Sequence, residues 1–211
     1  MEPFAYSFYE KVLASVEEMP NKSLYADETR DYSTKDFYYA SVEAANFLAK
    51  NNVRKGDLVF LRSPRCIDTF ILFVALSFLG AVTALSDPHQ GVLEAAKTYE
   101  LESQTRFALT NESGGDDVSA CGNWELWDLK ENRKIPCPIS LGKEAVAPCF
   151  DPSVDIYAPS FVIFTSGSSQ KAKAVANSQY TFINHIEKQL ESSSGTPEDC
   201  ILMLLPIHHQ R

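Results

Sequence analysis

The residues best suited to chemistry in this sequence stand in one short polar run, residues 165–173. It reads TSGSSQKAK, with four hydroxyl side chains, one glycine and two lysines, and it follows the apolar run Phe161–Phe164. Hydroxyls and backbone N–H groups donate hydrogen bonds to phosphate oxygens, and lysine adds a mobile positive charge. The run is therefore a candidate anion-binding loop, and a serine-rich solvated turn is the open alternative.

The charge around this loop favours an anion. The 211-residue chain has 19 Lys and Arg against 28 Asp and Glu, a net charge of −9, yet residues 156–186 contain no Asp or Glu. At the chain's average frequency, about four acids would be expected in a window of that length. The acidic balance also argues against a nucleic-acid partner, because such proteins carry a basic face. A Walker A loop is excluded because its second glycine is absent and alanines follow both lysines.

Among the elements that must position this loop, strands and helices alternate from Tyr32 to Thr110. Apolar residues recur with helical spacing in some segments, and Ser33 with Asp36 forms a capping-box pattern before one of them. Such alternation predicts an α/β fold, a doubly wound and mostly parallel sheet flanked by helices. The expected helices are 7–19, 33–51, 67–79, 92–101 and 178–190, and the expected strands are 23–26, 58–61, 81–85, 107–109, 124–129, 161–164, 174–176 and 201–205.

One uncharged stretch allows two interpretations. Thr69–Ser86 contains 18 residues without a charge, the lower limit for a membrane span. Gly80 interrupts it, and Asp68 and Asp87 flank it closely. We therefore expect a buried helix that ends at Gly80 and a buried strand after it, with a membrane span as the alternative. Arg62 and Arg65, which precede the helix, are expected to be solvated.

The remaining features concern compartment and organisation. The five cysteines are scattered, with no CxxC pair and no histidine at zinc-finger spacing, so we expect no metal site and a reducing, cytoplasmic location. The N-terminus lacks the basic and apolar regions of a signal peptide. Residues 111–159 are rich in proline towards their end and are expected to be an irregular, exposed connection. The last strand leads into Pro206–Arg211, where a longer chain would be expected to continue.

The polar loop resembles the phosphate-loop signature YTSGSTGxPKGV of the AMP-forming adenylating enzymes, which include acyl-CoA synthetases, peptide-synthetase adenylation domains and luciferases. Four more stretches are similar to motifs of that family in the expected order, and together they span nearly the whole chain. The five stretches are residues 32–37 (YSTKDF), 56–59 (GDLV), 79–88 (LGAVTALSDP), 164–175 (FTSGSSQKAKAV) and 205–209 (LPIHH).

The resemblance implies a fold and a reaction. Residues 1–211 would be the N-terminal part of an AMP-binding domain, the N-terminal subdomain of an acyl-CoA synthetase-like fold, without the C-terminal subdomain, and the uncharged stretch would be a core helix and strand. A carboxylic acid would attack the α-phosphate of Mg²⁺-bound ATP to give an acyl-adenylate, and coenzyme A would then take the acyl group. His209 would lie beside the substrate or nucleotide pocket. The β- and γ-phosphates would be held by Thr165, Ser166, Gly167, Ser168, Ser169 and Lys173.

The sequence also departs from the family pattern. Gln170, Ala172 and Ala174 replace two glycines and a proline of the signature, which limits close backbone approach to a phosphate. The family's adenine, ribose and catalytic lysine segments lie beyond His209, so no complete catalytic set is expected here. We therefore predict a fragment of an acid–thiol ligase that is inactive alone. The alternatives are a non-catalytic binding module of the same fold and part of a peptide-synthetase adenylation domain.

Overall fold

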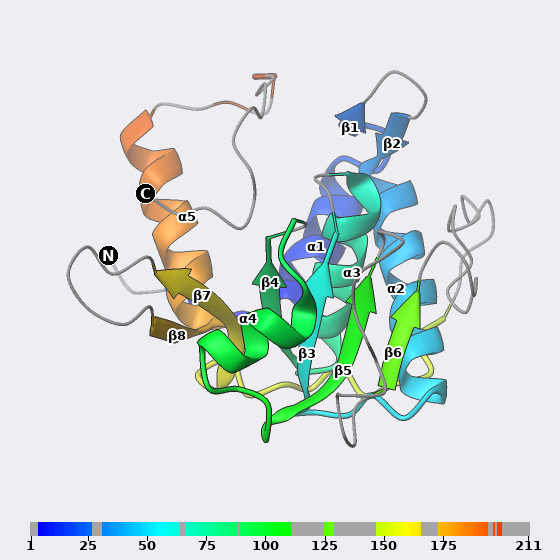
Figure 1. The fold of residues 1–211 in the computed structure, drawn as a ribbon. Helices are drawn as coiled ribbons and strands as arrows, with labels where there is room; N and C mark the ends of the chain where they lie inside the picture. Colours follow the sequence, from blue (N-terminus) through cyan, green and yellow to red (C-terminus); the bar gives the residue numbers. More distant parts are fainter. Residues whose placement is uncertain are drawn as a thin grey trace.

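The computed structural model describes residues 4–26, 31–63, 66–87, 89–110, 125–128, 147–165, 173–193, 196 and 198–199. Five helices and eight strands lie in these residues, and strands and helices alternate between residues 31 and 110 as expected (Figure 1). The helices are α1 (Phe8–Glu18), α2 (Thr34–Lys50), α3 (Ile67–Phe78), α4 (Val92–Thr98) and α5 (Gln179–Ser193). The strands are β1 (Ser23–Ala26), β2 (Asp31–Ser33), β3 (Leu58–Arg62), β4 (Val82–Ser86), β5 (Thr105–Thr110), β6 (Glu125–Asp128), β7 (Pro159–Thr165) and β8 (Lys173–Ser178).

Six of the strands form one sheet in the order β6-β5-β3-β4-β7-β8. The first five are parallel to their neighbours, and only the last pair, β7 and β8, is antiparallel. Strands β1 and β2 form a separate antiparallel pair. The predicted doubly wound, mostly parallel sheet is confirmed.

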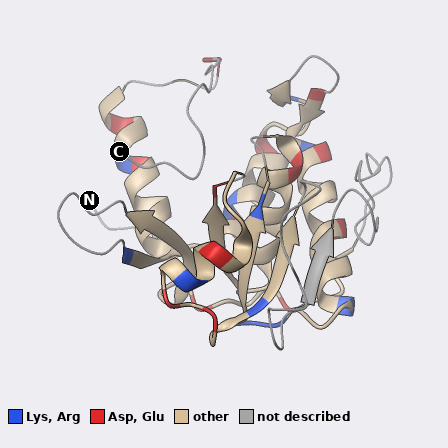
Figure 2. Cartoon of the chain, viewed as in Figure 1, with Lys and Arg blue, Asp and Glu red and all other residues tan. Residues whose placement is uncertain are grey.

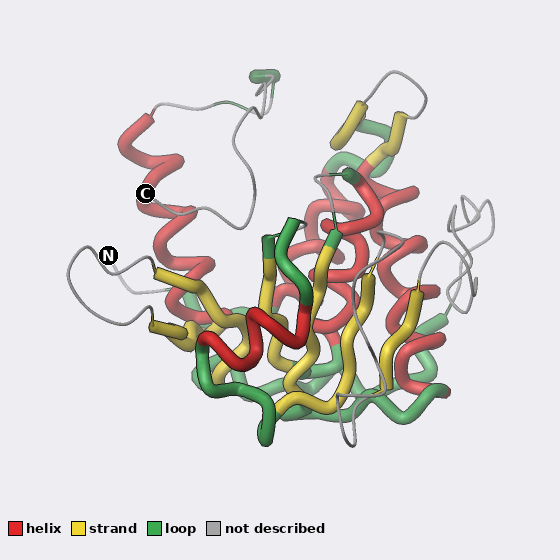
Figure 3. The backbone as a smooth tube through the Cα atoms, in the orientation of Figure 1, coloured by secondary structure: helices red, strands yellow, loops and turns green. Residues whose placement is uncertain are grey.

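Helices cover both faces of this sheet. Helices α1, α2 and α3 lie behind it and α4 lies in front (Figures 1 and 3). Alternate residues of β3 face opposite layers of helices. Val59 and Leu61 pack in the core with the three rear helices, while Leu58 and Phe60 pack with α4. A strand that is apolar on both faces is what a central parallel strand requires.

The local signals explain where helices begin and end. The side chain of Ser33 accepts a hydrogen bond from the backbone N–H of Asp36, and the carboxylate of Asp36 accepts one from the backbone N–H of Ser33, so the predicted capping box of α2 is confirmed. Helix α3 ends at Phe78, and Gly80 follows with a φ of +67°, a left-handed conformation that favours glycine. No helix among the described residues is long and apolar enough to cross a membrane. The buried-helix interpretation of this stretch is confirmed.

The chain path diverges at the carboxyl ends of two central strands. The chain leaves β3 for α3 on the rear face and leaves β4 for α4 on the front face, although β3 and β4 are neighbours. Ligands of such sheets bind outside the carboxyl ends of the strands where the path diverges in this way. Strand β7 runs parallel to β4, so its carboxyl end, Thr165, points to the same edge. The loop after β7 therefore starts where a ligand site is expected.

The segment expected as an irregular connection is described in two pieces. Strand β6 pairs in parallel with β5, and residues 147–158 contain neither helix nor strand. Asn46 of α2 holds the second piece, because its amide donates to the carbonyl of Ala147 (3.0 Å) and accepts from the N–H of Cys149 (2.7 Å). Phe150 then packs against Phe78. This piece is thus fixed to the rear layer of helices.

Candidate functional site

The candidate phosphate loop connects the two strands of an antiparallel hairpin. Strands β7 and β8 pair from Pro159 opposite Ser178 to Thr165 opposite Lys173. The hydroxyl of Thr165 donates a hydrogen bond to the carbonyl of Lys173 (3.3 Å), and both residues are exposed. The structure therefore brings together the two ends of the predicted loop. The other predicted site residues, Ser166, Gly167, Ser168, Ser169 and His209, lie outside the described residues.

Aromatic contacts hold the hairpin on both faces of the sheet. On the front face, the ring of Phe164 stacks on Tyr99 with centroids 4.0 Å apart and on Phe60 at 6.0 Å. On the rear face, Phe161 packs against Phe73 of α3 (5.9 Å) and Phe182 of α5 (5.1 Å). Aromatic side chains stabilise such packing because they bury a large apolar area and prefer specific ring-to-ring geometries. The base of the loop is thereby fixed to the core.

Helix α5 continues directly from the hairpin and is tied to distant parts of the chain. The side chain of Ser178 accepts a hydrogen bond from the N–H of Thr181 (3.1 Å) and so caps the start of the helix. Gln179 is 2% exposed; its carbonyl oxygen accepts from the N–H of Phe8 (2.8 Å), and its amide donates to the carbonyl of Ser77 (2.9 Å). Sequence reasoning missed this glutamine, because nothing local to it identifies partners about 100 and 170 residues away.

An ionic cluster joins the start of the chain to α5. The carboxylate of Glu187 accepts from the ammonium of Lys11 (2.6 Å) and from the hydroxyl of Tyr6 (2.6 Å). The hydrogen bond from Lys11 has the larger effect and that from Tyr6 the smaller, and together they hold the pKa of Glu187 below its ordinary value of 4.5. Burial and the hydrogen bond to Glu187 raise the pKa of Tyr6. The cluster therefore fixes α5, the helix that directly follows the hairpin, to the start of the chain.

This cluster predicts a pH-dependent stability. Because the pKa of Glu187 is lowered in the folded state, its stabilisation is complete above the ordinary carboxyl pKa and is lost as pH falls through the lowered value. We expect Glu187→Gln to reduce the free energy of unfolding by about 1 kcal/mol at pH 7, and the difference from the parent chain to shrink towards pH 3. Urea titrations across that range measure it. Glu191→Gln, an exposed position on the same helix, is the matched control, and equal effects at both positions would contradict the prediction.

A row of polar residues lies at the carboxyl ends of the central strands. Arg62, the last residue of β3, is in register with Ser86 of β4 and Thr110 of β5. Arg62 is 6% exposed, so the prediction that it is solvated is wrong; Arg65 lies outside the described residues. The Ser86 hydroxyl is buried without a hydrogen-bond partner among the described residues. The position of Arg62 directly after the apolar run of β3, a central strand, is the signal that could have indicated its burial.

The chemistry of the hairpin suits an anion. Its strands carry hydroxyl groups and a lysine, and residues 156–186 lack any carboxylate. Figure 2 shows the same region: β7, β8 and the first turns of α5 carry no acidic residue, whereas acids are common elsewhere on the molecule. Within the described residues, no group of three or more His, Cys, Asp or Glu side chains is arranged to hold a metal ion. Hydroxyl and ammonium donors fit phosphate oxygens.

The described residues define an α/β protein whose β7–β8 hairpin has its turn end at the carboxyl edge of a mostly parallel sheet. The sequence model of the AMP-binding enzyme family matches residues 12–210, so the chain belongs to that family. The resemblance found in the sequence motifs is thereby confirmed.

Known relatives are CoA ligases of greater length. The chain is 24% identical over 196 residues to 4-coumarate–CoA ligase 1 of Arabidopsis thaliana, covering 84% of this chain and 34% of that protein. It is 27% identical over 177 residues to 2-succinylbenzoate–CoA ligase of Oceanobacillus iheyensis, covering 82% of this chain and 34% of that protein. The chain thus spans about one third of the length of these relatives.

Solved structures share the fold. O-succinylbenzoate coenzyme A synthetase from Bacillus subtilis, in complex with AMP, superposes with a TM-score of 0.76 at 20% identity, over 94% of this chain and 49% of that one. The N-terminal subdomain of Klebsiella oxytoca NpsA, in complex with 3-hydroxyanthranilyl-AMSN, superposes with a TM-score of 0.76 at 16% identity, over 97% and 48% of the two chains. The described fold is that of the N-terminal subdomain of adenylating enzymes.

Proposed function

We propose that this chain is the N-terminal part of an ATP-dependent, AMP-forming acid–thiol ligase and contributes its phosphate-binding loop. The observation that carries the proposal is the hairpin β7–β8, in which Thr165 and Lys173 face each other at the two ends of a hydroxyl-rich, acid-free run. Family membership supports the same reaction class. The scattered cysteines, of which Cys66 and Cys149 are free, agree with a cytoplasmic location.

In the proposed reaction, a carboxylate oxygen attacks the α-phosphorus of ATP. A bond forms between the carboxylate oxygen and the α-phosphorus, the bond from the α-phosphorus to the oxygen that bridges to the β-phosphate breaks, and pyrophosphate leaves. The thiol of coenzyme A then loses its proton and attacks the acyl carbon, so that a carbon–sulfur bond forms, the bond from the acyl carbon to the AMP phosphate oxygen breaks, and AMP leaves. Charge accumulates on the departing pyrophosphate, so donors aimed at its oxygens lower the barrier. His209 is proposed beside the acyl or nucleotide pocket. The proposed pyrophosphate donors are Thr165, Ser166, Gly167, Ser168, Ser169 and Lys173.

Binding of ATP by the purified chain tests this proposal. We expect saturable binding of ATP by titration calorimetry, and Lys173→Ala should weaken it about tenfold because a charged hydrogen bond to phosphate is lost. Lys188→Ala, an exposed lysine on α5, is the matched control and should leave affinity unchanged. Absence of saturation, or equal weakening by both substitutions, would show that the loop does not bind phosphate.

Catalysis is a separate measurement. Because the chain covers about one third of the relatives' length, we expect no ATP–pyrophosphate exchange from residues 1–211 with any carboxylic acid. Exchange above background would contradict the predicted inactivity. The altered residues Gln170, Ala172 and Ala174 favour a second candidate, a non-catalytic binding module of the same fold. That candidate would be supported if a chain extended to the relatives' length bound ATP but formed no adenylate.

A further inference from the structure

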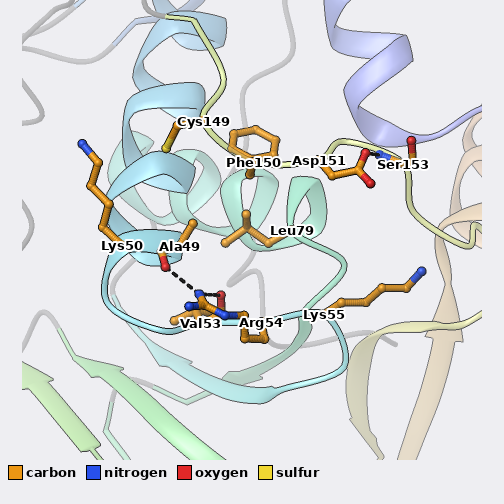
Figure 4. Close-up of a pocket in the computed structure, with 10 residues that line it drawn as sticks. All are labelled: Ala49, Lys50, Val53, Arg54, Lys55, Leu79, Cys149, Phe150, Asp151 and Ser153. Carbon is orange, nitrogen blue, oxygen red and sulfur yellow. Dashed lines mark hydrogen bonds between the residues drawn. The ribbon is translucent and has the colours of Figure 1, made fainter.

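A cavity of about 480 Å³ lies at the edge of the sheet opposite the hairpin loop. It is open on one side and is lined by the C-terminal end of α2, the turn before β3, Leu79 after α3, and residues 149–151 and 153 (Figure 4). Lys55 and Leu79 on its wall each precede the amino end of a parallel strand, whereas Thr165 lies at a carboxyl end. Volumes of this size accommodate small organic molecules.

The inner wall of this cavity is apolar and firmly packed. Val53 is 1% exposed and Leu79 is 8% exposed, and both belong to the rear core. The ring of Phe150 stacks on Phe78 with centroids 6.3 Å apart and meets Tyr9 edge-on at 6.3 Å. Because these side chains are held by the core, the wall is preformed, which reduces the ordering cost of binding.

Three cationic side chains line the opening of the cavity, and that of Arg54 is already hydrogen-bonded within the protein. The guanidinium of Arg54 donates to the carbonyls of Ala49 (2.6 Å) and Val53 (3.1 Å) and to the side chain of Asn52 (2.9 Å), so it closes the end of α2. Lys50 and Lys55 have no hydrogen bond or ion pair among the described residues, and they stand on opposite sides of the cavity in Figure 4.

The only acid on the lining as described is Asp151. Its carboxylate accepts from the N–H of Ser153 (2.9 Å), and that backbone hydrogen bond holds the pKa of Asp151 below its ordinary value. Three basic residues against one acid is a local excess of positive charge in a chain of net charge −9. Positive charge around an apolar hollow attracts organic anions.

We propose that this cavity binds a small organic anion, an aryl or alkyl group that bears a carboxylate or sulfonate. The apolar body lies against Val53, Leu79 and Phe150, and the charged group lies at the rim within reach of Lys50 or Lys55. Removing either ammonium weakens binding, while the apolar wall continues to supply part of the affinity. The site is separate from the loop and needs no nucleotide.

Cys149 provides a local reporter for this site. It is an exposed free cysteine on the cavity lining, and Asn46 fixes its backbone through the 2.7 Å hydrogen bond. A molecule in the cavity shields this thiol from a neutral alkylating reagent. Mass spectrometry of the Cys149 peptide separates its reaction from those of the other four cysteines.

The experiment measures alkylation of Cys149 by iodoacetamide at rising concentrations of the probe 1-anilinonaphthalene-8-sulfonate. We expect saturable protection of at least about fivefold, with a midpoint that rises about fivefold in Lys50→Gln and in Lys55→Gln. Lys97→Gln, on the exposed side of α4, is the matched control and should leave the midpoint unchanged. N-phenyl-1-naphthylamine has the same rings without the sulfonate, and its weaker protection should not respond to the lysine substitutions.

Three results would overturn the proposal. The first is an alkylation rate that the anionic probe does not change. The second is an equal midpoint shift in all three lysine variants, which would indicate a general charge effect. The third is equal protection by the neutral probe, which would leave the cavity apolar but without anion selectivity. All three lysines are at the protein surface or cavity rim, so the variants should fold, and matching thermal midpoints verify this.

Discussion

Replacing Phe78 by alanine should lower the free energy of unfolding by about 3–5 kcal/mol, a large fraction of the ~5–15 kcal/mol typical of a domain. Phe78 is 0% exposed on the last turn of α3. Its ring meets Tyr9 of α1 edge-on at 5.1 Å and stacks on Phe150 at 6.3 Å. The substitution therefore leaves a cavity where two helices and the segment 147–158 converge. Urea unfolding at 25 °C measures the change.

An exposed apolar residue is the control for this substitution. Leu24 on β1 is 53% exposed, so Leu24→Ala should change the free energy of unfolding by less than about 0.5 kcal/mol. A loss below about 1 kcal/mol for Phe78→Ala would contradict the predicted close packing at the end of α3. If the slope of the unfolding free energy against urea concentration is the same in Phe78→Ala and the parent chain, the loss of stability does not come from a change in the unfolded state.

Replacing Gln179 by alanine should cost about 2–4 kcal/mol. The substitution removes two hydrogen bonds, to the N–H of Phe8 (2.8 Å) and the carbonyl of Ser77 (2.9 Å), in a position that is 2% exposed. A buried donor left without a partner carries a desolvation penalty of about 1–3 kcal/mol, and the lost side-chain volume adds to it. Thermal or urea unfolding measures the loss, and hydrogen exchange should accelerate in β8, which leads directly into Gln179.

Gln189→Ala is the matched control, because this glutamine is exposed on the same helix. It removes the same side chain without disturbing a buried hydrogen bond, so a change within about 0.5 kcal/mol is expected. If both glutamine substitutions had the same effect, the lost stability would come from helix propensity and not from the link between α1, α3 and α5.

Local signals predicted most of the elements correctly. The capping pair Ser33 and Asp36 and the stop at Gly80 act within a few residues, so they can be recognised in the sequence itself. The uncharged stretch became a helix and a strand, because both faces of β4 are covered by other layers. The ends of this helix and strand differ from the predicted ones by at most one residue, within the usual uncertainty of helix and strand ends.

Contacts between distant residues could not be predicted in the same way. The order of the strands depends on which helix covers which face, so the neighbours of β3 follow only from the assembled layers. Gln179 is a buried polar residue whose hydrogen-bond partners, Phe8 and Ser77, lie far from it in sequence. For the candidate site, composition identified the loop, and the structure adds the pairing of Thr165 with Lys173; the roles of the loop residues remain predictions.

The contacts between the first residues of the chain and α5 have a consequence during synthesis. The backbone of Phe4 exchanges hydrogen bonds of 3.0 and 2.8 Å with the side chain of Asn184, across 180 residues. At a translation rate of ~5–20 residues per second, roughly 10–40 seconds pass before the ribosome has added this partner. Until then, the apolar face of α1 is incompletely covered. Formation of this long-range contact is therefore expected to be a late event in folding.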